Sequence, residues 1–144
     1  MLWRHGQTVY NAQNKFQGQT DIPLNETGRE QAAVAARYLA ALEPDAIFSS
    51  DLSRAVETAG ALARLTGLSV KLDADLRERG GGSWEGLTNA EIRERYPEAY
   101  ASWSPPDGEP VAEVIERASA ALLRIAEAMP GGSLAVVTDR KSVV

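Results

Sequence analysis

The feature that most constrains the fold of this chain is the alternation of short apolar runs with longer segments of helical periodicity. The runs 46–49, 69–72 and 134–138 have the length and residue types of strands. The segments between them repeat apolar residues every three to four positions, as one face of a helix does. This alternation predicts an α/β fold of three layers, in which helices cover both faces of a mostly parallel central sheet.

Capping residues predict where several helices begin and end. Thr27 and Glu30 have the spacing of a capping box, which predicts a helix that starts there and continues towards Pro44. Thr88 and Glu91 repeat the pattern and predict a second, shorter helix. The other helices expected from periodicity cover 52–66, followed by a glycine at its end, and 111–129.

Composition narrows the class of protein. The chain has 144 residues, enough for one domain with a sizeable core. Its formal net charge of −5 argues against wholesale binding to nucleic acid or to an anionic membrane. It has no cysteine and one histidine, so we expect no metal site and no cofactor. No apolar run approaches the ~20 residues of a membrane span, and no signal-peptide pattern is present, which favours a cytoplasmic protein.

Groups suited to an anion follow the expected strands. His5, the single histidine, stands between Arg4, which can hold a phosphate through two hydrogen bonds, and Gly6, which is expected to let a ligand approach the backbone. Arg54 follows the strand expected at 46–49. Ligands of parallel sheets bind beyond the carboxyl ends of the strands, so these side chains are expected to meet there. Each arginine taken alone could equally form a surface salt bridge.

Four segments carry this polar pattern in order along the chain. They read Arg4-His5-Gly6-Gln7-Thr8 with Asn11, Phe16-Gln17-Gly18 with Asp21, Ser49-Ser50-Asp51-Leu52 with Arg54 and Thr58, and Leu76-Arg77-Glu78 with Trp84-Glu85-Gly86. In this order they resemble the histidine phosphatase superfamily, which includes the cofactor-dependent phosphoglycerate mutases. The resemblance runs from Arg4 to Thr138.

The resemblance implies phosphoryl transfer through a phosphohistidine formed on His5. Arg4 and Arg54 would hold the non-bridging oxygens with charge-assisted hydrogen bonds. Glu78 would protonate the departing alkoxide and then deprotonate the attacking water. The remaining phosphate- or substrate-binding groups implied are Asn11, Gln17 and the amide of Gly18.

Residue types alone do not single out the acid. Asp73, Asp75 and Glu85 are acidic rivals of Glu78, and only the resemblance selects Glu78. The glycines at 80–82 lack the GxxxxGK[ST] pattern of a nucleotide-binding loop, so they are expected to give backbone freedom after Glu78.

The chain departs from the family after the last expected strand. Members carry there a second histidine followed by glycine, whereas this chain has Asp139-Arg140. A carboxylate about 4 Å from a phosphate oxygen costs roughly 4 kcal/mol per like-charge pair at an effective dielectric of about 20. Activity is therefore expected to be impaired, unless Arg140 compensates for the charge.

Both termini are short for this fold. Three residues precede Arg4, fewer than a central strand of about five residues needs. We therefore expect a histidine phosphatase domain over 1–138 that is incomplete at both termini, followed by a tail at 139–144 outside the family pattern. A naturally short protein is the alternative.

The function that these patterns favour is phosphomonoester hydrolysis on a small phosphorylated metabolite, of the sugar phosphate or phosphoglycerate type. A mutase is the alternative, but mutases carry a long insertion after the segment matching Trp84-Glu85-Gly86, and here 87–109 is compact. A non-catalytic phosphate-binding module is the other alternative, favoured by the missing second histidine. The expected partner is a small-molecule phosphate ester, and a homodimer is possible because nothing in the sequence fixes the oligomeric state.

Overall fold

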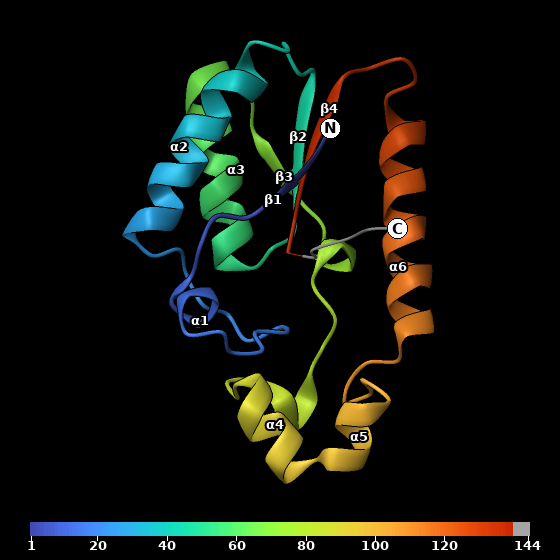
Figure 1. The fold of residues 1–144 in the computed structure, drawn as a ribbon. Helices are drawn as coiled ribbons and strands as arrows, with labels where there is room; N and C mark the ends of the chain where they lie inside the picture. The colour runs from blue at the N-terminus through green and yellow to red at the C-terminus, as the bar shows by residue number, and fades with distance from the viewer. Residues whose placement is uncertain (140–144) are drawn as a thin grey trace.

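A computed structural model describes residues 1–139 and contains a sheet of four parallel strands. In sheet order these are β1 (Leu2–Arg4), β4 (Leu134–Thr138), β2 (Ala46–Ser49) and β3 (Val70–Leu72), as Figure 1 shows. The strands and their parallel arrangement agree with the α/β fold expected from the sequence.

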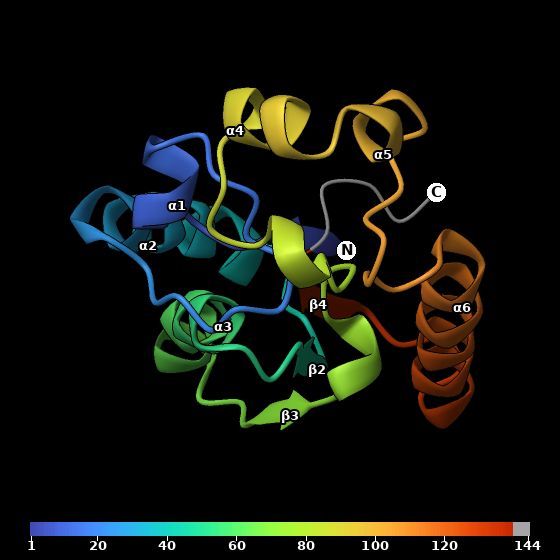
Figure 2. The same ribbon diagram turned by 90° about the horizontal axis from the view of Figure 1, so that it is seen from below.

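Helices cover both faces of this sheet. Helices α2 (Glu26–Ala40) and α3 (Ser53–Thr66) pack together on one face, and α6 (Val111–Ala128) covers the other (Figure 2). The three-layer prediction is therefore confirmed.

Alternating side chains of the central strands divide the core into two parts. Ile47 of β2 faces α2 and α3, whereas its neighbours Ala46 and Phe48 face α6. Alanines such as Ala36 and Ala59, both fully buried, let α2 and α3 approach the sheet and each other closely. The β1–β4–β2 framework that carries the site thus rests on packed side chains on both faces.

Short helices lie below the carboxyl ends of the strands (Figure 1). They are α1 (Val9–Ala12), α4 (Asn89–Arg95) and α5 (Pro97–Ala101). Two 3₁₀ turns, η1 (Ala74–Leu76) and η2 (Gly82–Trp84), belong to the connection between β3 and α4. These segments place several loops around one end of the sheet.

Local capping chemistry fixes most helix boundaries as expected, with one correction. Thr88 caps α4 in a capping box with Glu91, and Gly67 ends α3 with a left-handed φ of +73°. Helix α2, however, begins at Glu26 and is capped by Asn25, so the box predicted at Thr27 and Glu30 is wrong. Asn25 also donates to the Gln7 side chain at 2.9 Å, a tertiary contact that the spacing of Thr27 does not offer.

The first strand is short and joins the sheet beside β4. Leu2, Trp3 and Arg4 pair with Val136, Val137 and Thr138. His5 N continues the ladder by donating to Thr138 O at 3.3 Å, so residue 5 and residue 139 leave neighbouring strands side by side. Among residues 1–139, no helix has the length and apolarity needed to cross a membrane.

Candidate active site

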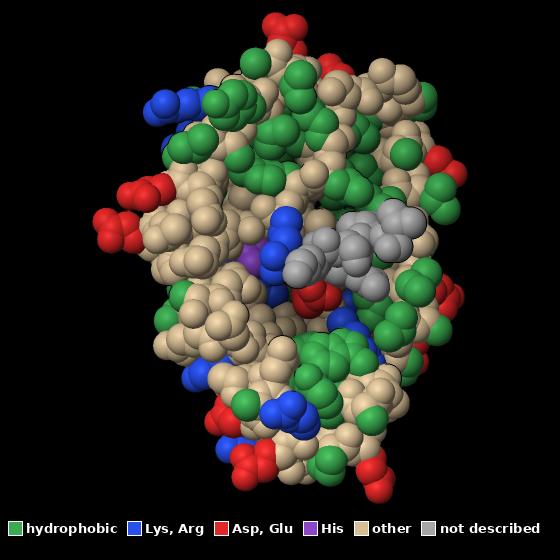
Figure 3. Space-filling view, viewed as in Figure 1, with side chains coloured by type: hydrophobic (Ala, Val, Ile, Leu, Met, Phe, Trp, Pro, Cys, Tyr) green, Lys and Arg blue, Asp and Glu red, His purple; other side chains and the backbone are tan. Residues whose placement is uncertain are grey.

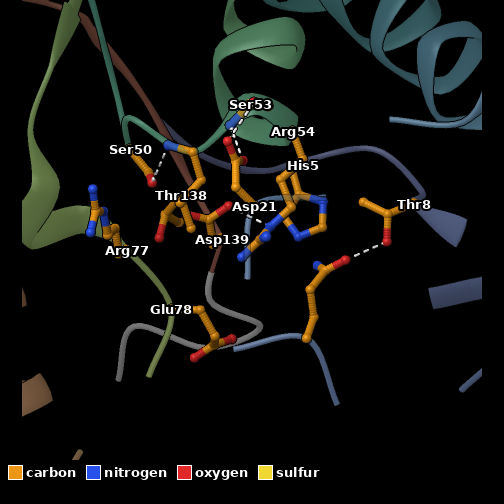
Figure 4. A network of polar contacts seen from close by, with 12 residues as sticks. His5, Thr8, Asp21, Ser50, Ser53, Arg54, Arg77, Glu78, Thr138 and Asp139 are labelled. Atoms are coloured by element: carbon orange, nitrogen blue, oxygen red, sulfur yellow. Dashed lines mark hydrogen bonds and ion pairs between the residues drawn. The ribbon is translucent and has the colours of Figure 1, made fainter. Parts of the chain in front are cut away.

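The carboxyl ends of β1, β4 and β2 bring together the groups that the sequence analysis singled out. His5 follows β1, Asp139 follows β4 and Ser50 follows β2. Figure 4 shows His5, Arg54 and Asp139 next to one another, with Glu78, from the segment after η1, below them in this view. The parallel arrangement thus assembles residues separated by more than 130 positions.

The imidazole of His5 is buried and held in one orientation. Its side chain lies at 7% exposure, and Nδ1 is 2.6 Å from the carbonyl oxygen of Gly6. Nε2 is buried and has no hydrogen-bond partner among residues 1–139. A neutral ring with its hydrogen on Nδ1 satisfies the Gly6 carbonyl and leaves a lone pair on Nε2.

The surroundings of His5 favour the neutral ring. The pKa of His5 is lowered from 6.5 to about 4, mainly by burial and to a lesser extent by the positive charges of Arg54 and Arg4, while the Gly6 hydrogen bond opposes the shift. The imidazole is therefore uncharged at neutral pH. This is the protonation state in which a histidine acts as a nucleophile.

Gly6 is required for packing and does not serve to admit a ligand. A Cβ on Gly6 would lie 2.3 Å from the carbonyl oxygen of Gly28 in the first turn of α2. The amide of Gly6 donates to Thr58 Oγ1 at 3.1 Å, which attaches the segment to α3 as well. The expectation that this glycine lets a ligand approach the backbone is therefore wrong, because α2 occupies that space.

Arg54 projects from the first turn of α3 into the site and is fully buried. Nη1 donates to Thr20 O at 2.8 Å, and Nη2 donates to Gly18 O at 2.7 Å. The third nitrogen, Nε, lies 2.8 Å from Asp139 Oδ1. Two nitrogens of this guanidinium thus donate to backbone carbonyls, and the third lies within ion-pair distance of a carboxylate oxygen without a hydrogen bond of good geometry.

The pair formed by Arg54 and Asp139 is completely removed from water. Burial raises the pKa of the Asp139 carboxyl, against the opposing effects of Arg54 and Ser50. Arg54 stays protonated because arginine titrates far above neutral pH. The Asp139 carboxylate therefore occupies one side of Arg54, the cation that the sequence analysis expected to hold phosphate. The compensating role suggested for Arg140 lies outside the described residues.

A second carboxylate, that of Glu85, holds the loop that contains Gly18. It accepts from the backbone amides of Gln19 at 3.0 Å, Thr20 at 2.8 Å and Gly81 at 2.8 Å. Gly18 has a left-handed φ of +54°, and a Cβ there would collide with the Glu85 side chain. Glu85 and Arg54 together fix the loop from both sides.

The side chains of Asn11 and Gln17 are tied to Thr8. Asn11 Oδ1 accepts from Thr8 N at 2.9 Å and completes the capping box of α1. Gln17 is buried, and its Oε1 accepts from Thr8 Oγ1. Their amide oxygens are thus engaged in the protein, which leaves the amide NH₂ groups as the donors available for a ligand.

A cavity of about 640 Å³ opens in front of this cluster. Five of the predicted site residues line it, and these are Arg4, Asn11, Gln17, Gly18 and Glu78. Figure 3 shows the histidine in a recess of this face, beside basic and acidic side chains. His5 and Arg54 are buried and are not among the lining residues.

The structure distinguishes Glu78 from its acidic rivals. Asp73 and Asp75 both pair with Arg124 of α6, at 3.0 and 2.8 Å. Glu85 is saturated by the loop that it holds, whereas Glu78 lines the cavity. Glu78 is therefore the one of these four carboxylates that a ligand in the cavity can meet.

Aromatic side chains form a further part of the cavity wall. Phe16 and Trp103 line the cavity, and both rings pack on the fully buried Trp84, at 5.8 and 5.2 Å between ring centroids. Trp103 is 46% exposed, so its face is accessible to a ligand. Trp84 is therefore a packing residue, and Trp103 forms part of the cavity wall.

Sequence reasoning missed three features of the site. The Arg54–Asp139 pair joins residues with no local pattern between them. Glu85 belongs to the segment Trp84-Glu85-Gly86, and the glycine beside it could have indicated that Glu85 holds a loop. Arg117, described below, looks in sequence like an ordinary solvent-facing arginine on α6.

Comparison with known proteins relates this arrangement to a family. The sequence profile described as "Histidine phosphatase superfamily (branch 1)" matches residues 1–142. A glucosyl-3-phosphoglycerate phosphatase from Mycolicibacterium vanbaalenii is 44% identical over 123 residues, covering 81% of this chain and 55% of that protein. One of the same name from Mycobacterium tuberculosis is 40% identical over 150 aligned positions, covering 100% of this chain and 67% of that protein.

A solved structure agrees with the fold. The structure of a mycobacterial glucosyl-3-phosphoglycerate phosphatase in complex with VO3 superposes with a TM-score of 0.88 at 37% identity, over 95% of this chain and 73% of the other. The chain spans 55–67% of the length of the two relatives above. Because the profile matches residues 1–142 and the fold agrees, this chain belongs to branch 1 of the histidine phosphatase superfamily.

Proposed function

We propose that this chain is a phosphomonoester hydrolase that works through a phosphohistidine on His5. The observation that carries the proposal is the buried, neutral imidazole whose Nδ1 is held by Gly6 and whose Nε2 is unpartnered within residues 1–139. A lone pair fixed beside two arginines is suited to attack phosphorus. Arg4, on the cavity wall, supplies the cation that is open to a phosphate.

The reaction has two steps. In the first, His5 Nε2 forms a bond to phosphorus, the ester P–O bond breaks, and the Glu78 carboxyl gives its proton to the departing alkoxide. In the second, the Glu78 carboxylate takes a proton from water, the water oxygen attacks phosphorus, and the P–N bond breaks to release inorganic phosphate. Support for this role of Glu78 comes from its place on the cavity wall, below the His5 cluster in Figure 4.

The substrate that we propose is a small metabolite with a sugar or glycerate part. The cavity volume of about 640 Å³ suits such a molecule. Lys15 and Arg79 offer positive charge to a carboxylate, and the amide of Asn89 and the ring of Trp103 offer contacts to hydroxyl groups and a sugar face. The names of the two relatives, glucosyl-3-phosphoglycerate phosphatase, agree with this substrate class.

We favour hydrolysis over mutase activity. The segment 87–109, where a mutase would carry its insertion, consists of α4, α5 and short turns. Its basic side chains Arg93 and Arg95 are exposed, and neither lines the cavity. Support for a second phosphate site is therefore lacking in this part of the described chain.

Phosphate binding without turnover is the second candidate function. It is favoured by the buried pair between Arg54 and Asp139, because a phosphate must share Arg54 with a carboxylate. We propose that this pair weakens activity without abolishing it, since Arg4 and His5 remain available.

Trapping the phosphoenzyme tests the proposal. The chain is mixed with 4-nitrophenyl phosphate, quenched in alkali and examined for a phosphoryl group that is stable in alkali and released by acid. We expect this label on wild type and none on His5→Gln. Label on His5→Gln, or none on a wild type that binds the inhibitor vanadate, would argue for the non-catalytic module.

A further inference from the structure

Arg117 of α6 holds the chain segment that presents Glu78. Nη1 of Arg117 donates to Asp75 O at 2.7 Å and to Arg77 O at 2.8 Å, and Nη2 donates to Glu78 O at 3.0 Å. These carbonyls belong to the residues that lead into the proposed acid. The Arg117 side chain, which comes from α6, therefore fixes the position of the Glu78 backbone.

The same guanidinium is locked by Glu109. Nε lies 2.6 Å from Glu109 Oε1, and Nη2 lies 2.8 Å from Oε2, in a bidentate pair whose side chains are both 18% exposed. With its three bonds to carbonyls, Arg117 has an acceptor for each of its five N–H groups. A guanidinium satisfied in this way has one orientation, and so has the segment bonded to it.

Glu109 also holds the backbone that follows Glu78 in the chain. Its carboxylate accepts from Gly80 N at 3.1 Å, and its backbone amide donates to Gly80 O at 2.8 Å. Its carbonyl oxygen accepts from Arg79 Nε at 2.6 Å. The backbone before Glu78 is thus held by Arg117, and the backbone after it by Glu109.

We infer that Arg117 and Glu109 are positioning residues for the general acid Glu78. The inference rests on the proposed function, because it assigns these residues to the protonation step. Neither side chain lines the cavity, so neither is expected to touch the substrate. Displacing a catalytic group by about 1 Å can lower a rate by roughly 10²-fold, and the pair prevents such a displacement.

The test compares Arg117→Met with a matched control on the same helix. Arg124→Met also removes an arginine of α6 that binds the η1 segment, but Arg124 is 53% exposed, and its hydrogen bonds within residues 1–139 go to the side chains of Asp73 and Asp75. Turnover is measured on 4-nitrophenyl phosphate, whose leaving group needs little protonation, and on an alkyl phosphate such as glycerol phosphate, whose leaving group needs it.

We expect Arg117→Met to lower kcat for the alkyl ester about 10- to 100-fold and for the aryl ester less than about threefold. Arg124→Met should change both less than about twofold. In a Glu78→Gln background the Arg117→Met change should have no further effect on the alkyl ester. Equal slowing of both esters, or an undiminished effect in the Glu78→Gln background, overturns the inference.

Hydrogen exchange gives a readout that does not depend on catalysis. Backbone amides of 76–80 should exchange faster in Arg117→Met than in wild type, and faster than in Arg124→Met. Unchanged exchange in this segment overturns the inference even if the protein proves to have no phosphatase activity. If Arg117→Met does not fold, Glu109→Gln, which keeps the side-chain volume and weakens the same pair, is used in its place.

Discussion

The two neighbouring strands β1 and β4 end at the same edge of the sheet but present opposite chemistry there. After β1, His5 is uncharged and its Nε2 has no hydrogen-bond partner within residues 1–139, and the neighbouring Arg4 lines the open cavity. After β4, Asp139 offers a buried carboxylate that is already paired with Arg54. The proposed function places a phosphoryl group at the β1 end, whereas the β4 end places a negative charge beside Arg54, one of the two cations proposed to bind that group.

This difference teaches that the framework and the charge of a site are set independently. The backbone is held by the same hydrogen-bond ladder at both strand ends, since His5 N donates to Thr138 O and continues the ladder between the two strands. The side chain of Asp139, just beyond that ladder, sets the charge beside Arg54. Under the proposed function, the nucleophile His5 would therefore stay intact while the affinity for the transferring phosphoryl group is lowered.

The largest effect is expected from removing the reactive group of the β1 end. His5→Ala should lower turnover of 4-nitrophenyl phosphate by at least about 10³-fold, because loss of a nucleophile removes the covalent route. The chain has no other histidine to replace it. Steady-state rates and phosphoenzyme trapping check the outcome, and a variant that keeps the wild-type rate would refute the assignment of the nucleophile.

Acid stability should reveal the buried neutral state of His5. Its pKa is lowered from 6.5 to about 4, so its contribution to stability is present above pH 6.5 and is lost as the pH falls from 6.5 towards 4. The contribution is about 3 kcal/mol at most. Urea unfolding of wild type and of His5→Gln between pH 7 and pH 4 measures it. Wild type should lose more stability than the variant, and parallel curves would show that His5 titrates normally.

The substitution Glu78→Gln tests the proposed general acid, which lines the cavity. Removing the acid should slow an alkyl phosphate about 10²-fold, within the usual range of general acid catalysis. The aryl ester should be slowed much less. Asp75→Asn is the matched control, because Asp75 precedes Glu78 but is paired with Arg124. Equal slowing of both esters by Glu78→Gln would remove Glu78 from the protonation step.

Removing the negative charge of Asp139, at the end of β4, should have a smaller effect than the changes above. The quantity that it changes is the stability of the fold. In Asp139→Asn the buried charge of Arg54 loses its ion partner, although Arg54 keeps its bonds to Gly18 O and Thr20 O. We expect a loss of about 1–3 kcal/mol, which inorganic phosphate should partly restore. Thermal unfolding with and without phosphate checks this, and a variant whose stability ignores phosphate would show that the anion does not reach Arg54.

The parts of the fold governed by local chemistry could be predicted from the sequence. Strand 46–49 is bounded as expected, and α3 ends at Gly67 because only glycine takes a positive φ there without strain. The start of α2 could not be predicted, because Asn25 is favoured by its bond to Gln7, which is distant in sequence. The spacing of Thr27 and Glu30 fits a cap equally well but falls inside the helix.

The candidate site divides in the same way. Arg54 could be located because it follows an expected strand, and parallel strands end at one edge of a sheet. His5 could be located because it is the single histidine and stands beside Arg4 in a segment that resembles the family. The partner of Arg54 could not be foreseen, since Asp139 is 85 positions away and only the fold brings the two together. The hydrogen bonds from Arg117 to the backbone near Glu78 could not be predicted either, because a helical arginine that binds backbone carbonyls has the same sequence pattern as one that faces solvent.

The affinity for orthovanadate tests most directly whether Asp139 holds Arg54 back from the phosphoryl site. Calorimetric titration is carried out on wild type, on Asp139→Asn, and on the control Asp51→Asn, which neutralises a carboxylate paired with Arg77 at the same end of the sheet. The account predicts that Asp139→Asn binds vanadate at least about tenfold more tightly than wild type, since one like-charge pair is worth more than the 1.4 kcal/mol of a tenfold change. It predicts little change for Asp51→Asn. Equal or weaker binding by Asp139→Asn would contradict it and would show that Asp139 belongs to the working site.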